Sequence, residues 1–119
     1  MRKRVLIFDD DADILEVCSI VLESSGFEVM THNNCEEIVE KIEQFHPDVV
    51  LMDNKIPPLG GIKASQTIRA SDQRGQTPIV FFSANHDVSK LATEAGANYF
   101  LEKPFELDRL VSLIEQACG

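Results

Sequence analysis

Apolar residues along this chain form five short runs, and segments with helical periodicity separate one run from the next. The runs lie at residues 5–8, 27–31, 49–52, 79–82 and 97–101. Four of them are apolar at nearly every position, as parallel strands buried on both faces should be, whereas the run at 27–31 alternates like an edge strand. Strands that alternate with helices predict βαβ units around a single parallel sheet.

The intervening segments place apolar residues three and four positions apart, which puts them on one face of a helix. These stripes are Ile14, Val17, Cys18, Val21 and Leu22; Ile38, Ile42 and Phe45; Val88, Leu91, Ala92 and Ala95; and Leu107, Leu110, Val111 and Ile114. A capping box of Asn34 and Glu37 is expected to start the second helix, and residues 62–70 form a weaker third. Residues 1–119 therefore form one (βα)5 domain in this interpretation.

Composition narrows the functional classes. With 119 residues, 44% of them hydrophobic, the chain has the size and core of one compact domain. A net charge of -9 argues against direct binding to nucleic acid or to an anionic membrane surface. No apolar run approaches the roughly 20 residues of a membrane span, and we expect a cytoplasmic protein. Three cysteines without a C-x-x-C spacing suggest neither a disulfide framework nor a zinc site.

Chemically active side chains follow four of the five predicted strands. In an open doubly wound sheet, ligands bind at the carboxyl ends of the strands, so the side chains there share one edge. They are Asp9, Asp10 and Asp11 after the first strand, Asp53 after the third, Ser83 after the fourth and Lys103 after the fifth. Any single Asp at such a position is more simply a helix cap, but the convergence of the whole set favours chemistry.

Carboxylates packed together repel one another unless a cation lies between them, and an all-oxygen cluster that keeps some waters suits Mg²⁺, or Mn²⁺ in its stead. A carboxylate beside such a metal, with a lysine and a hydroxyl nearby, provides a nucleophile, charge neutralisation and a hydrogen-bond donor. These are the groups needed to receive a phosphoryl group.

The sequence resembles the receiver domain of two-component response regulators over essentially its full length. The resemblance rests on the segments 5–11 and 47–53, on Pro57 and Gly61, on Ser83-Ala84, and on residues 95–97 leading to Lys103-Pro104-Phe105. It implies a flavodoxin-like (βα)5 fold, a doubly wound five-stranded parallel sheet with strand order 2-1-3-4-5. It also implies a signalling switch, not a metabolic enzyme, that is phosphorylated by a histidine kinase or histidine phosphotransfer protein and catalyses its own phosphorylation and dephosphorylation.

Roles for individual residues follow from the same resemblance. Asp53 is implied to be the phosphoacceptor and a metal ligand. Asp10 is implied to bind the metal directly, Asp9 to act largely through water, and the backbone carbonyl of Lys55 to supply a further ligand. Lys103 is implied to pair with the phosphoryl oxygens through a side chain that follows a cis Lys103-Pro104 peptide.

The resemblance implies that two residues change conformation on phosphorylation. It implies that two others tune the lifetime of the phosphorylated state. Ser83 carries the hydroxyl that moves onto the phosphoryl group, and Phe100 is the aromatic residue whose rotamer follows. Phe100 stands where the family often has Tyr, so the ring can act by burial but not through a phenolic hydroxyl. Lys55 and Asn85 occupy the positions that affect how long the phosphoryl group survives.

An apolar patch beside the predicted site is a candidate docking surface for a helical phosphodonor. Ile14 and Leu15 on the first helix, with Pro104 and Phe105 after the fifth strand, would form it. Partial burial of these residues under the rim loops is the simpler alternative. Ile20 lies off the core stripe, so at least one of Leu15 and Ile20 is expected to face water.

Three other functions share some of these features. A haloacid-dehalogenase-type phosphatase would use Asp9 as nucleophile and Asp11 as acid, but it leaves Asp53 without a role. A flavin mononucleotide binder needs a hydroxyl-rich phosphate loop, where this chain has three aspartates. A receiver-like module that binds partners without phosphorylation does not need the complete acceptor site.

Overall fold

The computed structural model describes residues 2–71 and 77–119, within which strands and helices alternate. The elements follow in the order β1 (Arg4–Phe8), α1 (Ala12–Ser24), β2 (Glu28–His32), α2 (Ile38–Phe45), β3 (Val49–Asp53), α3 (Gly61–Ser71), β4 (Ile79–Ser83), α4 (Val88–Ala95), β5 (Tyr99–Glu102) and α5 (Leu107–Cys118). The predicted (βα)5 alternation is confirmed in the described residues.

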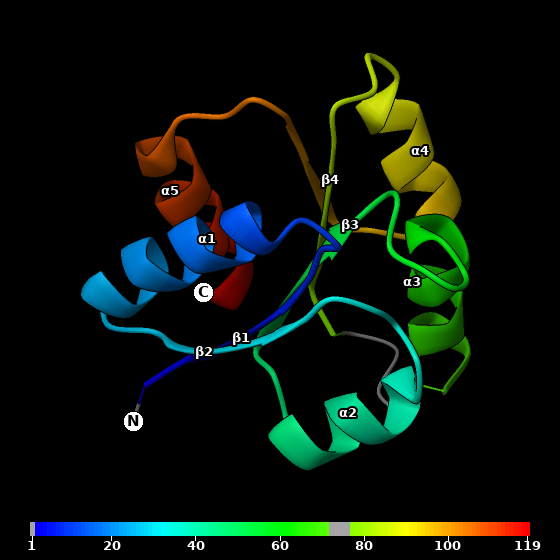
Figure 1. Ribbon diagram of the computed structural model, residues 1–119, viewed down its shortest axis with the longest axis horizontal. Helices are drawn as coiled ribbons and strands as arrows, with labels where there is room; N and C mark the ends of the chain where they lie inside the picture. The colour runs from blue at the N-terminus through cyan, green and yellow to red at the C-terminus, as the bar shows by residue number, and fades with distance from the viewer. Residues whose placement is uncertain (1, 72–76) are drawn as a thin grey trace.

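All strand pairs in the sheet are parallel, and the strand order is β2-β1-β3-β4-β5. This order confirms the expected flavodoxin-like sheet and the position of β2 at one edge. Figure 1 shows α1 and α5 on one face of the sheet and α2, α3 and α4 on the other. The chain reverses its direction of winding between β1 and β3, so the carboxyl ends of these two strands flank the switch point of the topology.

Two apolar layers cover the two faces of the sheet because successive strand side chains point in opposite directions. In β1, Leu6 and Phe8 pack in the layer under α2, α3 and α4, whereas Val5 and Ile7 pack in the layer under α1 and α5. Every residue of β3 and β4 is buried. This double burial explains why these strands appear in the sequence as continuous apolar runs.

The strand boundaries differ from the prediction by one or two residues, and one helix cap also differs. β2 begins and ends one residue later than expected, and β5 begins at Tyr99 because the Ala97 N–H donates to Ala92 O at the end of α4. The Asn34–Glu37 capping box is wrong: Asn34 Oδ1 accepts from the Glu36 N–H, and Glu37 has a left-handed backbone. The helix therefore starts only at residue 38.

A tight loop after β3 fixes the direction in which Asp53 leaves the sheet. The Gly61 N–H donates to Asn54 O at 2.8 Å, which folds the start of α3 back over the end of the strand. A Cβ atom at Gly61 would collide with the backbone carbonyl of Asp53. Glycine is therefore required at this position by close backbone approach.

We expect Gly61→Ala to lower the free energy of unfolding by about 2 to 3 kcal/mol, because the loop must shift to accept the methyl group. Gly26→Ala is the matched control, since a Cβ there meets nothing within 4 Å and only the positive φ of +96° is strained. That control should lose about 1 kcal/mol. Urea unfolding measures both losses, and an equal loss in the two variants would contradict the role assigned to Gly61.

Candidate functional site

The carboxyl ends of β1, β3 and β4 and the segment after β5 meet around a cavity of about 300 Å³, which we call the acidic cleft. Its lining residues are Asp9, Asp10, Asp11, Asp53, Asn54, Lys55, Ser83, Ala84, Asn85 and Lys103. The predicted convergence of charged and hydroxyl side chains at one edge is therefore present. Asp9, Asp53 and Ser83 are buried, whereas Asp10 and Lys55 are exposed at the mouth of the cleft.

Lys103 joins the two buried carboxylates of the cleft. Its Nζ atom donates to Asp9 Oδ2 at 2.8 Å and to Asp53 Oδ1 at 2.9 Å, and it lies 4.4 Å from the centre of the Phe82 ring. The Lys103-Pro104 peptide is cis, as the resemblance implied, and the Lys103 N–H donates to Ser83 O. The side chain is thus held from both ends.

Burial and ion pairing act in opposite directions on these groups. Burial raises the pKa of Asp9 above its usual value, against the lowering effect of the hydrogen bond from Lys103. Burial alone would lower the pKa of Lys103, but the hydrogen bonds to Asp9 and Asp53 outweigh it and raise that pKa. Lys103 therefore stays a cation, and its hydrogen bond opposes the effect of burial on Asp9.

The acidic cleft also has the donor set of a divalent-cation site. One carboxylate oxygen from each of Asp9, Asp10 and Asp53 lies within 4.8 Å of the others. A second Asp53 oxygen, Oδ2, accepts from the Lys55 N–H at 3.2 Å, which fixes the loop that follows the strand. Hard cations such as Mg²⁺ prefer oxygen ligands of this kind, so the residues present fit such an ion.

Asp11 has a different function from its two neighbours. Its Oδ1 atom accepts from the N–H groups of Asp13 at 2.9 Å and Ile14 at 3.4 Å, which makes it the N-cap of α1. Its own N–H donates to Asp9 Oδ1. A side chain committed to the helix N-terminus is poorly suited to the acid role that the dehalogenase-type alternative would give it.

The end of β4 carries the predicted switching residue Ser83, and the loop after it carries the predicted tuning residue Asn85. Ser83 Oγ accepts from the Asn85 N–H at 3.0 Å, and Asn85 Oδ1 accepts from the Asp87 N–H at 2.8 Å. Phe100 lies apart from them on the edge strand β5, 46% exposed, and does not line the acidic cleft. The structure thus brings Ser83 and Asn85 to the cleft but leaves Phe100 outside it.

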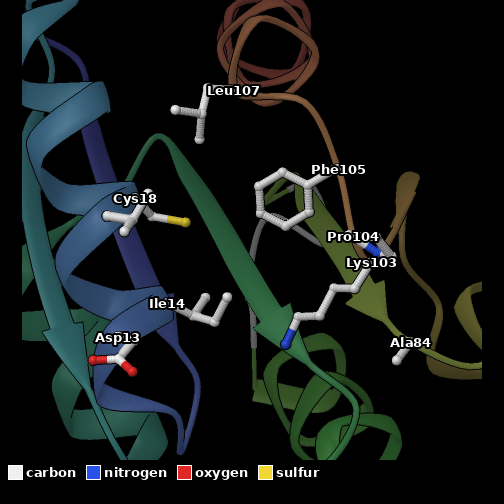
Figure 2. Close-up of a pocket in the computed structure, with 9 residues that line it drawn as sticks. Asp13, Ile14, Cys18, Ala84, Lys103, Pro104, Phe105 and Leu107 are labelled. Atoms are coloured by element: carbon white, nitrogen blue, oxygen red, sulfur yellow. The ribbon is translucent and has the colours of Figure 1, made fainter.

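A second cavity, of about 400 Å³, lies between α1 and the start of α5, and we call it the apolar groove. It is lined by Asp13, Ile14, Val17, Cys18, Ala84, Lys103, Pro104, Phe105 and Leu107. Figure 2 shows Ile14 and Cys18 directed into it from α1, with Phe105 and Leu107 on the opposite side. Three of the four predicted docking residues line it, whereas Leu15 packs against the core under α1 and α5.

Four of the groove residues lie on predicted core stripes, and two of these, Val17 and Leu107, are exposed. They are 44% and 42% exposed, and Ile20 is 58% exposed, as expected for a residue off the stripe. The signal was present in the sequence, since α1 has more apolar positions than one buried face can hold. The excess residues on the side toward α5 remain uncovered and form one wall of the groove.

The chain belongs to the response regulator receiver domain family, whose model matches residues 5–115. Among curated proteins it is 34% identical over 116 residues to the regulatory protein AtoC of Escherichia coli. It is 33% identical over 116 residues to the DNA-binding response regulator MtrA of Mycobacterium tuberculosis. Each match includes 96% of this chain, but the chain spans only 25% of AtoC and 50% of MtrA.

Solved structures show the same fold. The chemotaxis response regulator CheY4 of Vibrio cholerae superposes with a TM-score of 0.89 at 25% identity, covering 98% of this chain and 99% of that one. A putative response regulator from Chloroflexus aurantiacus gives 0.92 at 28% identity, covering 99% and 98%. The protein is therefore a receiver domain of two-component signalling, and its family works with histidine kinases.

The expectations about membrane spans and about nucleic-acid binding have different outcomes. No helix in residues 2–71 and 77–119 is long and apolar enough to cross a membrane. The expected absence of nucleic-acid binding is not confirmed, because MtrA is named as a DNA-binding protein of about twice the matched length.

We expect Lys103→Met to lower the free energy of unfolding by about 3 kcal/mol at pH 7 in EDTA, because it leaves buried carboxylates without their cation. The pKa of Asp9 then rises further, and a carboxyl whose pKa is raised in the folded state costs its full stability above that pKa and progressively less as the pH falls toward the unfolded-state value. The deficit should therefore shrink as the pH falls toward 4.5. Urea unfolding at both pH values measures it.

The matched control is Lys90→Met on the exposed surface of α4, which removes the same charge. Its effect should stay within about 0.5 kcal/mol at either pH. A Lys103→Met deficit that is independent of pH would refute the pairing as its cause.

Proposed function

We propose that this receiver domain accepts a phosphoryl group on Asp53 from a phosphohistidine of a histidine kinase or histidine phosphotransfer protein. The observation that carries the proposal is the setting of Asp53. It ends the central strand β3, is 5% exposed, and has Lys103 on one oxygen with Asp9 and Asp10 close by. A carboxylate that opens onto a cleft beside a fixed cation is suited to nucleophilic attack on phosphorus.

In the proposed transfer, a carboxylate oxygen of Asp53 forms the new bond to phosphorus while the bond from the histidine nitrogen to phosphorus breaks. The electron pair of the broken bond stays on the histidine nitrogen. Lys103 neutralises charge on the phosphoryl oxygens, and its hydrogen bonds hold that charge in position before the donor arrives. Hydrolysis by an in-line water returns the free carboxylate, so the domain catalyses both its phosphorylation and its dephosphorylation.

A divalent cation completes this proposal. Asp9, Asp10 and Asp53 would hold Mg²⁺ or Mn²⁺ together with the backbone carbonyl of Lys55. When bound, the ion supplies charge neutralisation for the transferred group. Asp10 is the exposed member of the three, which suits a direct ligand at the mouth of the cleft, while Asp9 is buried and already bonded to Lys103.

The signal is proposed to leave the site through Ser83 and Phe100. The Ser83 hydroxyl lies at the end of β4 with an N–H donated to it by Asn85, so it is free to donate its own proton to a phosphoryl oxygen. The ring of Phe100 is half-exposed, and its burial would change the surface that a downstream protein contacts.

The phosphodonor is proposed to dock in the apolar groove, where Ile14, Pro104 and Phe105 line the cavity and Leu15 supports α1 from beneath. We further propose a cytoplasmic location, a receiver unit extending over residues 1–119, and no direct contact of this unit with nucleic acid or membrane. The last point rests on the net charge of -9.

Incubation with acetyl phosphate and Mg²⁺ should add a single acid-stable, base-labile phosphoryl group at Asp53, and EDTA should prevent it. Mass spectrometry of the intact protein and its peptides makes the measurement. Asp53→Asn should not be labelled, whereas Asp48→Asn, at the opposite end of β3, should be labelled like the wild type. Labelling at Asp9, or undiminished labelling of Asp53→Asn, would instead support the dehalogenase-type alternative.

The lifetime of the phosphorylated state is expected to depend on Lys55. Its side chain is exposed at the cleft, and its ammonium makes no ion pair among the described residues. Asn85 does not restrain it, because the Asn85 side chain accepts from Asp87 instead. An ammonium paired with phosphoryl oxygens would obstruct the water that attacks in line.

Lys55→Ala should therefore shorten the half-life of phospho-Asp53 several-fold, a barrier change of about 1 kcal/mol. The measurement is the decay of the phosphorylated form after donor removal at fixed Mg²⁺. Lys63→Ala, in the first turn of α3, provides a lysine control that should decay like the wild type. A half-life that is unchanged or longer in Lys55→Ala would rule out shielding by this side chain.

A further inference from the structure

The acidic residues of this chain are distributed very unevenly. Residues 5–40 contain ten Asp and Glu and no Lys or Arg, whereas the rest of the chain carries the other ten acidic residues and all eleven basic ones. The uninterrupted acidic stretch includes β1, α1, β2 and the start of α2. The net negative charge of the protein therefore resides in this stretch, and its helix α1 forms one wall of the apolar groove.

Exposed carboxylates occur in both segments that line the apolar groove; one of them lines it directly and four lie close to lining residues in the sequence. Asp13 lines it from α1, Asp10 and Asp11 lie where it meets the acidic cleft, and Glu106 and Asp108 flank Leu107 on the side of α5. We call these five residues the acidic rim. None of them forms an ion pair within residues 2–71 and 77–119. The one lysine that lines the groove has its ammonium bound to Asp9 and Asp53.

Helix stabilisation explains only part of the acidic rim. Asp13 and Asp108 lie in the first turns of α1 and α5, where a negative charge interacts favourably with the helix dipole. Glu106 makes no capping hydrogen bond through its side chain. The dipole also does not explain why the 13 residues of α1 contain no basic residue to offset Asp13 and the acids that follow it.

In contrast to its charged rim, the floor of the groove is apolar and partly exposed to solvent. Val17 and Leu107 line it at 44% and 42% exposure, and Ile14 and Phe105 lie on its two sides (Figure 2). A trough of about 400 Å³ beside a helix of 13 residues, about 20 Å long, matches an apolar ridge on a partner helix. Among the described residues, the five carboxylates of the acidic rim lie near this apolar floor against one exposed basic residue, Arg109, so the surface specifies the charge as well as the shape of that partner.

We propose that the apolar groove and acidic rim select a phosphodonor whose docking helix carries apolar anchors flanked by lysine or arginine, and reject donors with an acidic docking face. This inference rests on the proposed phosphoacceptor function and names the class of donor. Cations on the donor would pair with carboxylates that form no ion pair within the described residues, and would speed the encounter. An acidic donor would meet repulsion at the same positions, which provides the discrimination.

The test uses one histidine phosphotransfer protein in two versions, in which three surface positions on the helix beside the phosphohistidine are all lysine or all glutamate. Each version is phosphorylated and mixed with this domain, and its transfer rate is divided by the rate of labelling with acetyl phosphate. At low ionic strength the lysine version should transfer at least about tenfold faster to the wild type. Added salt should reduce the difference.

Two double variants separate the acidic rim from overall charge. Asp13→Asn with Asp108→Asn should remove most of the preference for the lysine version. Glu43→Gln with Glu94→Gln removes the same charge from exposed positions on α2 and α4 and should preserve it. Melting temperatures of all variants show whether loss of the dipole interaction has altered the fold.

Equal transfer from the lysine and glutamate versions, or an equal loss of preference in the two double variants, would overturn the inference. Failure of both versions to transfer, while acetyl phosphate still labels Asp53, would overturn it too and leave the phosphoacceptor function intact. Absence of labelling by acetyl phosphate would instead count against the proposed function itself.

Discussion

One ammonium group balances the charge at the carboxyl edge of this sheet. Lys103 contacts Asp9 and Asp53, which are buried and belong to the neighbouring central strands β1 and β3. Without that cation, two buried carboxylates and the adjacent Asp10 would destabilise the fold by mutual repulsion. The position of the ammonium depends in turn on β5, the loop after it and the Ser83 carbonyl, so the last strand must be in place for the first and third to carry their acids.

The fold and the centre of the site were predictable from the sequence because both depend on strong, periodic signals. Continuous apolar runs such as the one ending at Phe82 are typical of strands covered on both faces, and they identified four of the five strands, while the alternating run at 27–31 identified the edge strand β2. Parallel strands then bring their carboxyl ends together without further information. The meeting of Asp9, Asp53, Ser83 and Lys103 follows from topology alone, although up to 94 residues separate the partners.

The remaining features depend on contacts between segments that no local pattern encodes. The capping box failed because the Cys35 N–H donates to Pro57 O, which ties the segment before α2 to the loop after β3. Val17 has the spacing of a core residue, yet it is 44% exposed because, among the described residues, no element covers that side of α1. Leu15 packs inward beside it because the turn of the helix places it toward the sheet. Phe100 was assigned a role by family likeness, and its half-exposed position is a property of the edge of the sheet.

The apolar groove and the acidic cleft adjoin one another and share two lining residues. Lys103 and Ala84 line both cavities, with the lysine stem facing the groove and its ammonium reaching the end of β3 (Figure 2). A molecule seated in the groove is therefore already a neighbour of Asp53, and it need not cross open surface to reach it. The docking surface and the acceptor carboxylate adjoin one another, so a partner that fits the apolar groove is positioned next to Asp53 as soon as it binds.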